Sequence, residues 1–106
     1  MAGKKDRGPE KVGEVLGEVL EKAGLKRTIL RAEVADQWEE RVGEAIGEVT
    51  RARGLRKSAL VVEVRSSAWL MELNLMKPEI LRRLNEGRDE ALIETIVFVL
   101  AEDGTR

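Results

Sequence analysis

The length, composition and charge of this chain exclude several classes of protein. Its 106 residues suffice for one domain with a single modest core, because a chain of this size buries roughly two-thirds of its unfolded surface. Cysteine, histidine and tyrosine are absent, which excludes disulfides, thiolate nucleophiles, the usual zinc ligands and the side chain that most often moves protons near neutral pH. We therefore expect no catalytic residue, no metal site, no cofactor and no small-molecule substrate.

Apolar and charged residues are distributed differently along the chain. Apolar residues make up 42% of it but form no run near the roughly 20 residues that span a bilayer, and no signal peptide is evident, so we expect a cytoplasmic protein without membrane contact. Residues 1–49 hold nine Lys/Arg and eleven Asp/Glu (−2), residues 50–88 hold nine and four (+5), and residues 89–106 hold one and five (−4). The basic centre indicates either a face for an anionic partner or an ordinary solvated surface.

Two amphipathic helices are predicted first, after a flexible tail at residues 1–8. Pro9 suits the first turn of a helix, and apolar residues then recur at helical spacing up to Gly24, where this helix should end. Thr28 can cap a second helix, which Gly43 should bend. The first stripe comprises Val12, Val15, Leu16, Val19, Leu20 and Ala23, and the second comprises Leu30, Val34, Trp38, Val42 and Ile46.

From Val49 the period changes from helical to extended. Residues 49–55 and 59–65 read as two strands of a hairpin joined by Arg-Lys-Ser. Alternation places Leu60, Val62 and Val64 on one side of the second strand, and Val61, Glu63 and Arg65 on the other. In the first strand the same rule puts Arg51, Arg53 and Leu55 on one side.

A long helix and a final strand complete the chain. The helix should cover residues 67–86, with Trp69, Leu73, Met76, Ile80 and Leu84 on one face. Pro78 predicts either a kink or two helices that meet near Lys77. Residues 92–100 carry apolar side chains on both faces of an extended chain, so we expect a strand with both faces at least partly covered. A short tail follows at residues 102–106.

These elements define an α+β fold with the order α-α-β-β-α(α)-β and a three-stranded sheet backed by helices. The long helix links the second and third strands as a crossover. The two tails leave one domain at residues 9–101.

Three features could carry function. Ser66 or Ser67, at the junction of strand and helix, is favoured as a helix cap over a phosphate cradle or a nucleophile, since no histidine is available as a base. Trp38 and Trp69 lie on apolar stripes and are interpreted as core anchors, with base stacking as the alternative. The basic residues of the hairpin are either an anion-binding surface or charges that protect an edge strand. The candidate nucleic-acid-binding residues are Arg51, Arg53, Arg56, Lys57 and Arg65, extended by Lys77, Arg82 and Arg83.

The order of several motifs resembles the DciA family over about residues 25–100. The motifs are Trp38, Val42-Gly43, Ala45-Ile46, Thr50, Leu60-x-Val62-x-Val64, Ser66-Ser67-x-Trp69-x-x-x-Leu73, Leu81, Leu84-Asn85 and Ile96-x-Phe98. The resemblance implies a fold related to the type II KH domain. It also implies a bacterial accessory of DNA replication that engages the DnaB-type replicative helicase and helps deliver it to single-stranded DNA. A KH-like RNA-binding adaptor and a protein-interaction module without nucleic-acid binding remain alternatives.

Overall fold

The computed structural model of the protein describes residues 2–3, 5–6 and 9–102, with side chains described from residue 16 onward. Two short strands at the amino-terminal end, β1 (Ala2–Gly3) and β2 (Lys5–Asp6), pair in parallel. The predicted tails at 1–8 and 102–106 include residues 1, 4, 7, 8 and 103–106, which lie outside the described residues.

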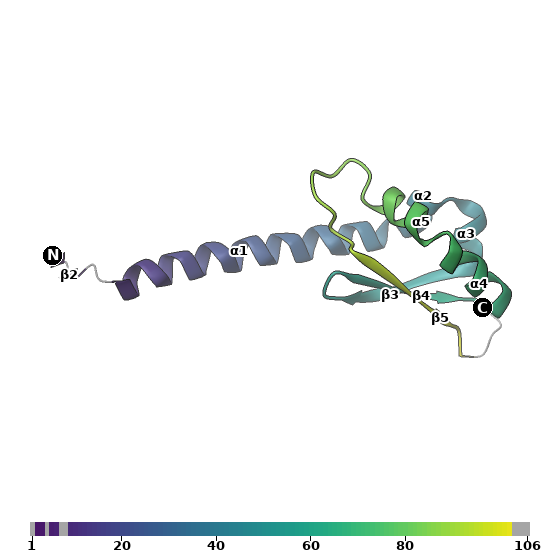
Figure 1. Ribbon diagram of the computed structural model, residues 1–106, viewed down its shortest axis with the longest axis horizontal. Coiled ribbons are helices and arrows are strands. Elements are labelled where there is room, and N and C mark those ends of the chain that lie inside the picture. Colours follow the sequence, from purple (N-terminus) through teal and green to yellow (C-terminus); the bar gives the residue numbers. More distant parts are fainter. Residues whose placement is uncertain (1, 4, 7–8, 103–106) are drawn as a thin grey trace.

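The first helix is longer than the sequence predicted. α1 (Pro9–Asp36) runs without interruption through Gly24, so the predicted helix end at Gly24 and the new start at Thr28 are wrong. A glycine inside a helix costs only about 1 kcal/mol relative to alanine, and neighbouring residues can sustain the helix across it. Thr28 does not cap a helix, since its Oγ1 donates a hydrogen bond back to the carbonyl of Gly24, at 3.0 Å. The first half of α1 extends away from the other elements (Figure 1).

Two short helices follow α1. α2 (Trp38–Val42) and α3 (Glu44–Val49) are separated by Gly43, whose φ of +96° lies in a region that other residues rarely adopt. The bend predicted at Gly43 is therefore confirmed as a complete break. The indole Nε1 of Trp38 donates to Thr50 Oγ1 at 2.8 Å, and this hydroxyl donates to the carbonyl of Ile46 at 2.6 Å. Trp38 is thus a buried anchor that links α2 to the end of α3 and the start of the sheet.

The predicted hairpin is confirmed, with one irregularity. β3 (Thr50–Arg56) and β4 (Ala59–Val64) pair antiparallel, but the register shifts by one residue between Ala52 and Gly54. The shift is a β-bulge, which changes the side of the sheet that later residues face. Leu55 accordingly packs against the core together with Ala52, so the prediction that it shares a side with Arg51 and Arg53 is wrong.

The predicted long helix consists of two helices that meet at Met76. α4 (Ser67–Leu75) is capped by Ser66, whose Oγ accepts a hydrogen bond from the backbone N–H of Trp69 at 3.3 Å. α5 (Lys77–Leu84) carries Pro78 in its first turn, where a missing N–H interrupts no helical hydrogen bond. The cap and the junction near Lys77 are both confirmed.

The last strand, β5 (Thr95–Leu100), pairs in parallel with β4, so the sheet order is β3-β4-β5 and the α4–α5 segment is the crossover. The helices lie on one face of this sheet (Figure 1). Ile96 and Phe98 point into the core, but Val97 and Val99 remain 40% and 37% exposed. Both faces of β5 were expected to be at least partly covered: the helices cover the face of Ile96 and Phe98, and the face of Val97 and Val99 is only partly covered.

The core lies between the covered face of the sheet and the helices. Leu60, Val62 and Val64 of β4 are fully buried, and they belong to one core cluster with apolar side chains from all five helices. The protein is thus an α+β domain with an open, mixed, three-stranded sheet packed against helices, which is compatible with the KH-like fold. Within the described part of the chain, no helix has the length and apolar character needed to cross a membrane.

Asn85 fixes the approach to β5. Its Nδ2 donates to the carbonyls of Leu81 and Ile93 at 3.0 and 2.9 Å, and its Oδ1 accepts from the N–H of Ile93 at 3.0 Å. Arg31 adds a hydrogen bond from Nε to the carbonyl of Leu92 at 2.7 Å. The connection between α5 and β5 is therefore fastened to both α5 and α1, although it forms no regular secondary structure.

We predict that Asn85→Ala destabilises the fold by about 2 kcal/mol, because it leaves backbone groups of the buried Ile93 without partners. Asn74→Ala is the matched control: the Asn74 amide bonds only the carbonyl of Leu70 on an exposed surface, so we expect a change within about 0.5 kcal/mol. Urea unfolding of the two variants measures both values. Equal losses of stability would contradict the role assigned to Asn85.

Candidate nucleic-acid interface

The face of the sheet that the helices leave open is built by alternation in its three strands. Arg51 of β3, Glu63 of β4 and Val99 of β5 lie side by side in the register, and Val61 pairs with Val97 in the next row. These residues alternate with the core residues of the same strands, so their side chains emerge on the opposite side. We call this surface the open face. It combines valines with charged residues of the hairpin.

Glu63 is the charged centre of the open face. Among the residues whose burial is described, it is the only charged side chain classed as buried, with 9% of its surface exposed. Arg53, at the bulge, forms an ion pair with its carboxylate through Nη1 and Oε2. Arg65 lies two residues beyond Glu63 on the same side of the chain, and its backbone N–H donates to the carbonyl of Val49 at 2.9 Å. Arg51 and Arg65 therefore lie near Glu63 in the chain register, but among the described residues Arg53 alone is paired with its carboxylate.

The other end of the hairpin carries Arg56 and Lys57. Arg56 ends β3, and Lys57 begins the two-residue connection to β4 with a φ of +59°. Both residues are exposed. The seven residues of β3 span about 20 Å, so the predicted hairpin cations line the hairpin from one end to the other.

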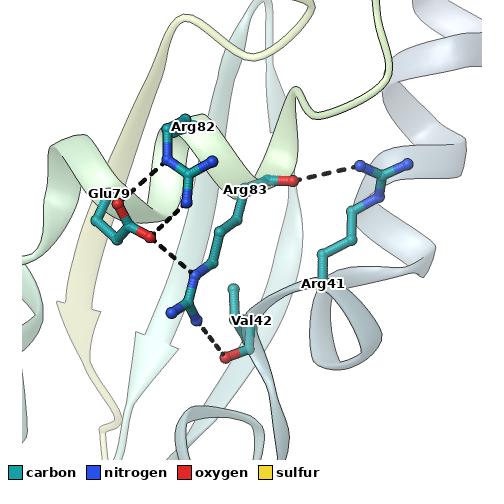
Figure 2. Close-up of polar contacts among 5 residues, drawn as sticks. All are labelled: Arg41, Val42, Glu79, Arg82 and Arg83. Carbon is teal, nitrogen blue, oxygen red and sulfur yellow. Dashed lines mark hydrogen bonds and ion pairs between the residues drawn. The ribbon is translucent and has the colours of Figure 1, made fainter.

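The three cations predicted to extend this surface lie in the helical layer instead. Lys77 is half-buried with its Nζ 5.9 Å from the centre of the Phe98 ring, on the core side of β5. Arg82 and Arg83 contact Glu79 on their own helix, with N–O distances of 2.7 and 3.2 Å (Figure 2). Their hydrogen bonds, that of Arg82 above all, hold the pKa of the Glu79 carboxyl below its ordinary value. The structure does not bring these residues together with the hairpin.

Arg83 also connects helices, together with a residue that sequence reasoning did not single out. Arg83 Nη1 donates to the carbonyl of Val42 at 3.2 Å, and Arg41 Nη1 donates to three carbonyls at the end of α5 (Figure 2 shows one of them). A cation suits the negative end of a helix. The two arginines therefore lock α2 against α5. Their pairing could not be found in the sequence, since the partners lie more than 40 residues apart.

The junction of α4 and α5 lacks the loop with which KH domains hold a nucleic-acid backbone. That loop reads Gly-x-x-Gly, and no such pattern occurs between residues 65 and 86. Beside α4, the partly buried Trp69 lines an open groove of about 630 Å³ that is apolar except for Glu44, Glu72 and Arg83. Trp69 is thus less completely buried than the predicted core anchor, whereas Trp38 fits that prediction fully.

The projecting half of α1 forms a second distinctive surface. Leu16, Val19 and Leu20 recur at helical spacing and are 57%, 57% and 71% exposed. The same stripe continues along α1 to Leu30 and the fully buried Val34. One apolar stripe is therefore buried at its carboxyl end and exposed along its amino end.

A protein-family model matches most of the chain. The family model described as "Dna[CI] antecedent, DciA" matches residues 11–98, which include the helical layer, the hairpin and most of β5. No curated protein matches the chain. The family name implies, in general terms, an accessory role in loading the DnaB helicase. Since the match covers most of its length, the chain belongs to the DciA family.

Proposed function

We propose that this protein is a non-enzymatic replication accessory that binds the DnaB-type replicative helicase and assists its loading onto single-stranded DNA. The observation that carries the proposal is the family match over residues 11–98. The geometry supports two separate contacts, one to DNA through the hairpin and one to the helicase through an apolar surface.

The DNA contact is proposed for the cations of the hairpin. Arg51, Arg56, Lys57 and Arg65 are exposed and form no ion pair with any described residue. Unpaired guanidinium and ammonium groups exchange counterions for phosphates without first breaking an internal contact. By contrast, Arg82 and Arg83 are already engaged by Glu79. Binding through so few cations should be weak and strongly dependent on salt.

The helicase contact is proposed for the exposed stripe of α1. An amphipathic helix that presents large apolar side chains at i, i+3 and i+4 suits a groove on a partner protein. Leu16, Val19 and Leu20 meet this description, and they continue a stripe whose other end is already used for packing. Docking would remove these apolar side chains from water, which contributes roughly 25 cal/mol of binding free energy per Å² of apolar surface buried.

We predict that the purified protein retains a DnaB-type helicase in a pull-down, and that Leu16→Glu combined with Leu20→Glu weakens this binding at least about tenfold. The matched control, Glu18→Gln with Glu21→Gln, changes exposed residues of the same helix and should leave binding within about twofold. Binding curves for the three proteins are the measurement. Equal affinities would mean that the stripe of α1 does not contact the helicase. Absence of binding by the unchanged protein would overturn the helicase role.

We expect the protein to bind single-stranded DNA weakly. The logarithm of its binding constant should fall with the logarithm of the salt concentration at a slope of about −2 to −3. The slope follows from four unpaired cations at about 0.7 each. Arg51, Arg53, Arg56 and Lys57 changed together to glutamate should abolish DNA binding and keep helicase binding, whereas the control Arg82→Gln should change DNA affinity less than about twofold. Fluorescence anisotropy at several salt concentrations gives each slope. Tighter binding to RNA of the same sequence would instead favour the RNA-binding adaptor.

A further inference from the structure

The open face holds a small hollow at the end of the hairpin that is remote from its turn. The hollow has a volume of about 190 Å³, and its lining includes Arg51 of β3, Glu63 of β4, Arg65 directly after β4 and Glu48 of α3. The register places Arg51 directly opposite Glu63, and Arg65 follows Glu63 on the same side. Two arginines, Arg51 and Arg65, therefore line the hollow together with two carboxylates, those of Glu63 and Glu48.

The three arginines around Glu63 are not equivalent. Arg51 and Arg65 form no hydrogen bond from their guanidinium groups to other described residues, so both can bind an external anion. Arg53 points to Glu63 because the bulge at Ala52 and Gly54 removes it from the regular ladder. The ion pair with Glu63 engages the guanidinium group of Arg53, which would otherwise lie free beside the guanidinium group of Arg51.

The pairing of Arg53 with Glu63 has a physical cause. The Glu63 side chain is only 11% exposed, whereas that of Arg53 is 56% exposed. A carboxylate with so little access to water needs a partner to offset its lost hydration, while an exposed arginine does not. Glu63 therefore retains Arg53, although Arg53 could still reach solvent.

We propose that Arg51 and Arg65 bind a backbone phosphate of single-stranded DNA in this hollow, and that Glu63 acts as an internal counter-ion that weakens this binding. Glu63 repels the phosphate and also keeps Arg53 from contacting the neighbouring one. The inference rests on the proposed function of the hairpin and adds a residue that limits its affinity. Weak, rapidly reversible contact is what an accessory needs if it delivers another protein to DNA and then leaves.

The direct test is Glu63→Gln, which keeps the size of the side chain and its capacity to accept a hydrogen bond from Arg53. We expect affinity for a labelled oligothymidylate at low salt to rise about three- to tenfold, since a negative charge close to the bound phosphate is removed. The salt slope should steepen by about 0.7, because Arg53 becomes available for one more phosphate. Adding Arg53→Gln to this variant should return the slope to that of the unchanged protein.

Glu40→Gln is the matched control, since it removes one carboxylate from the exposed surface of α2 and makes the same change in net charge. It should bind DNA like the unchanged protein, and thermal unfolding by circular dichroism verifies that each variant is folded. If Glu63→Gln and Glu40→Gln give equal affinities and slopes, the counter-ion role is wrong while DNA binding by the hairpin stands. If neither the unchanged protein nor Glu63→Gln binds DNA at low salt, the proposed DNA contact is wrong as well.

Discussion

The one-sided burial of β4 is the constraint on which the rest of the domain depends. β4 is the central strand, and its Leu60, Val62 and Val64 are fully buried. A strand alternates its side chains, so the helices that cover these three residues cannot also cover their neighbours. All the packing of α2 to α5 is therefore directed to one face. The other face stays open and becomes available for a ligand.

Arginine side chains have different roles in this protein, and the role of each one depends on the groups that it contacts. Arg41 and Arg83 are structural, because they donate to backbone carbonyls that join α2 and α5. Arg53 neutralises a nearly buried carboxylate, whereas Arg51 and Arg65 have no such partner. An exposed ion pair contributes only about 0 to 1 kcal/mol to stability, so an arginine in such a pair can leave its partner at little cost in free energy. Glu63 differs because its burial makes separation from Arg53 costly.

Much of the fold could be predicted from the sequence, and the errors have local causes. The apolar stripe from Val34 to Ile46, the cap by Ser66 and the break near Lys77 follow from residue spacing and are confirmed. Gly24 and Gly43 look alike in the sequence, yet only Gly43 adopts a positive φ and ends a helix. The bulge in β3 and the exposure of Val97 and Val99 depend on tertiary pairing. For the candidate site, the sequence identified the cations but could not separate the free ones from those held by Glu63 and Glu79.

We propose that single-stranded DNA binds to the open face and not to the helical layer. Backbone amide chemical shifts of the isotopically labelled protein, followed during titration with an oligothymidylate, distinguish the two surfaces. We expect the largest shifts along the hairpin, at Arg51, Glu63 and Arg65, with little change on α5. Shifts concentrated on α4 and α5, around Trp69 and Arg82, with an unchanged hairpin would contradict the proposal.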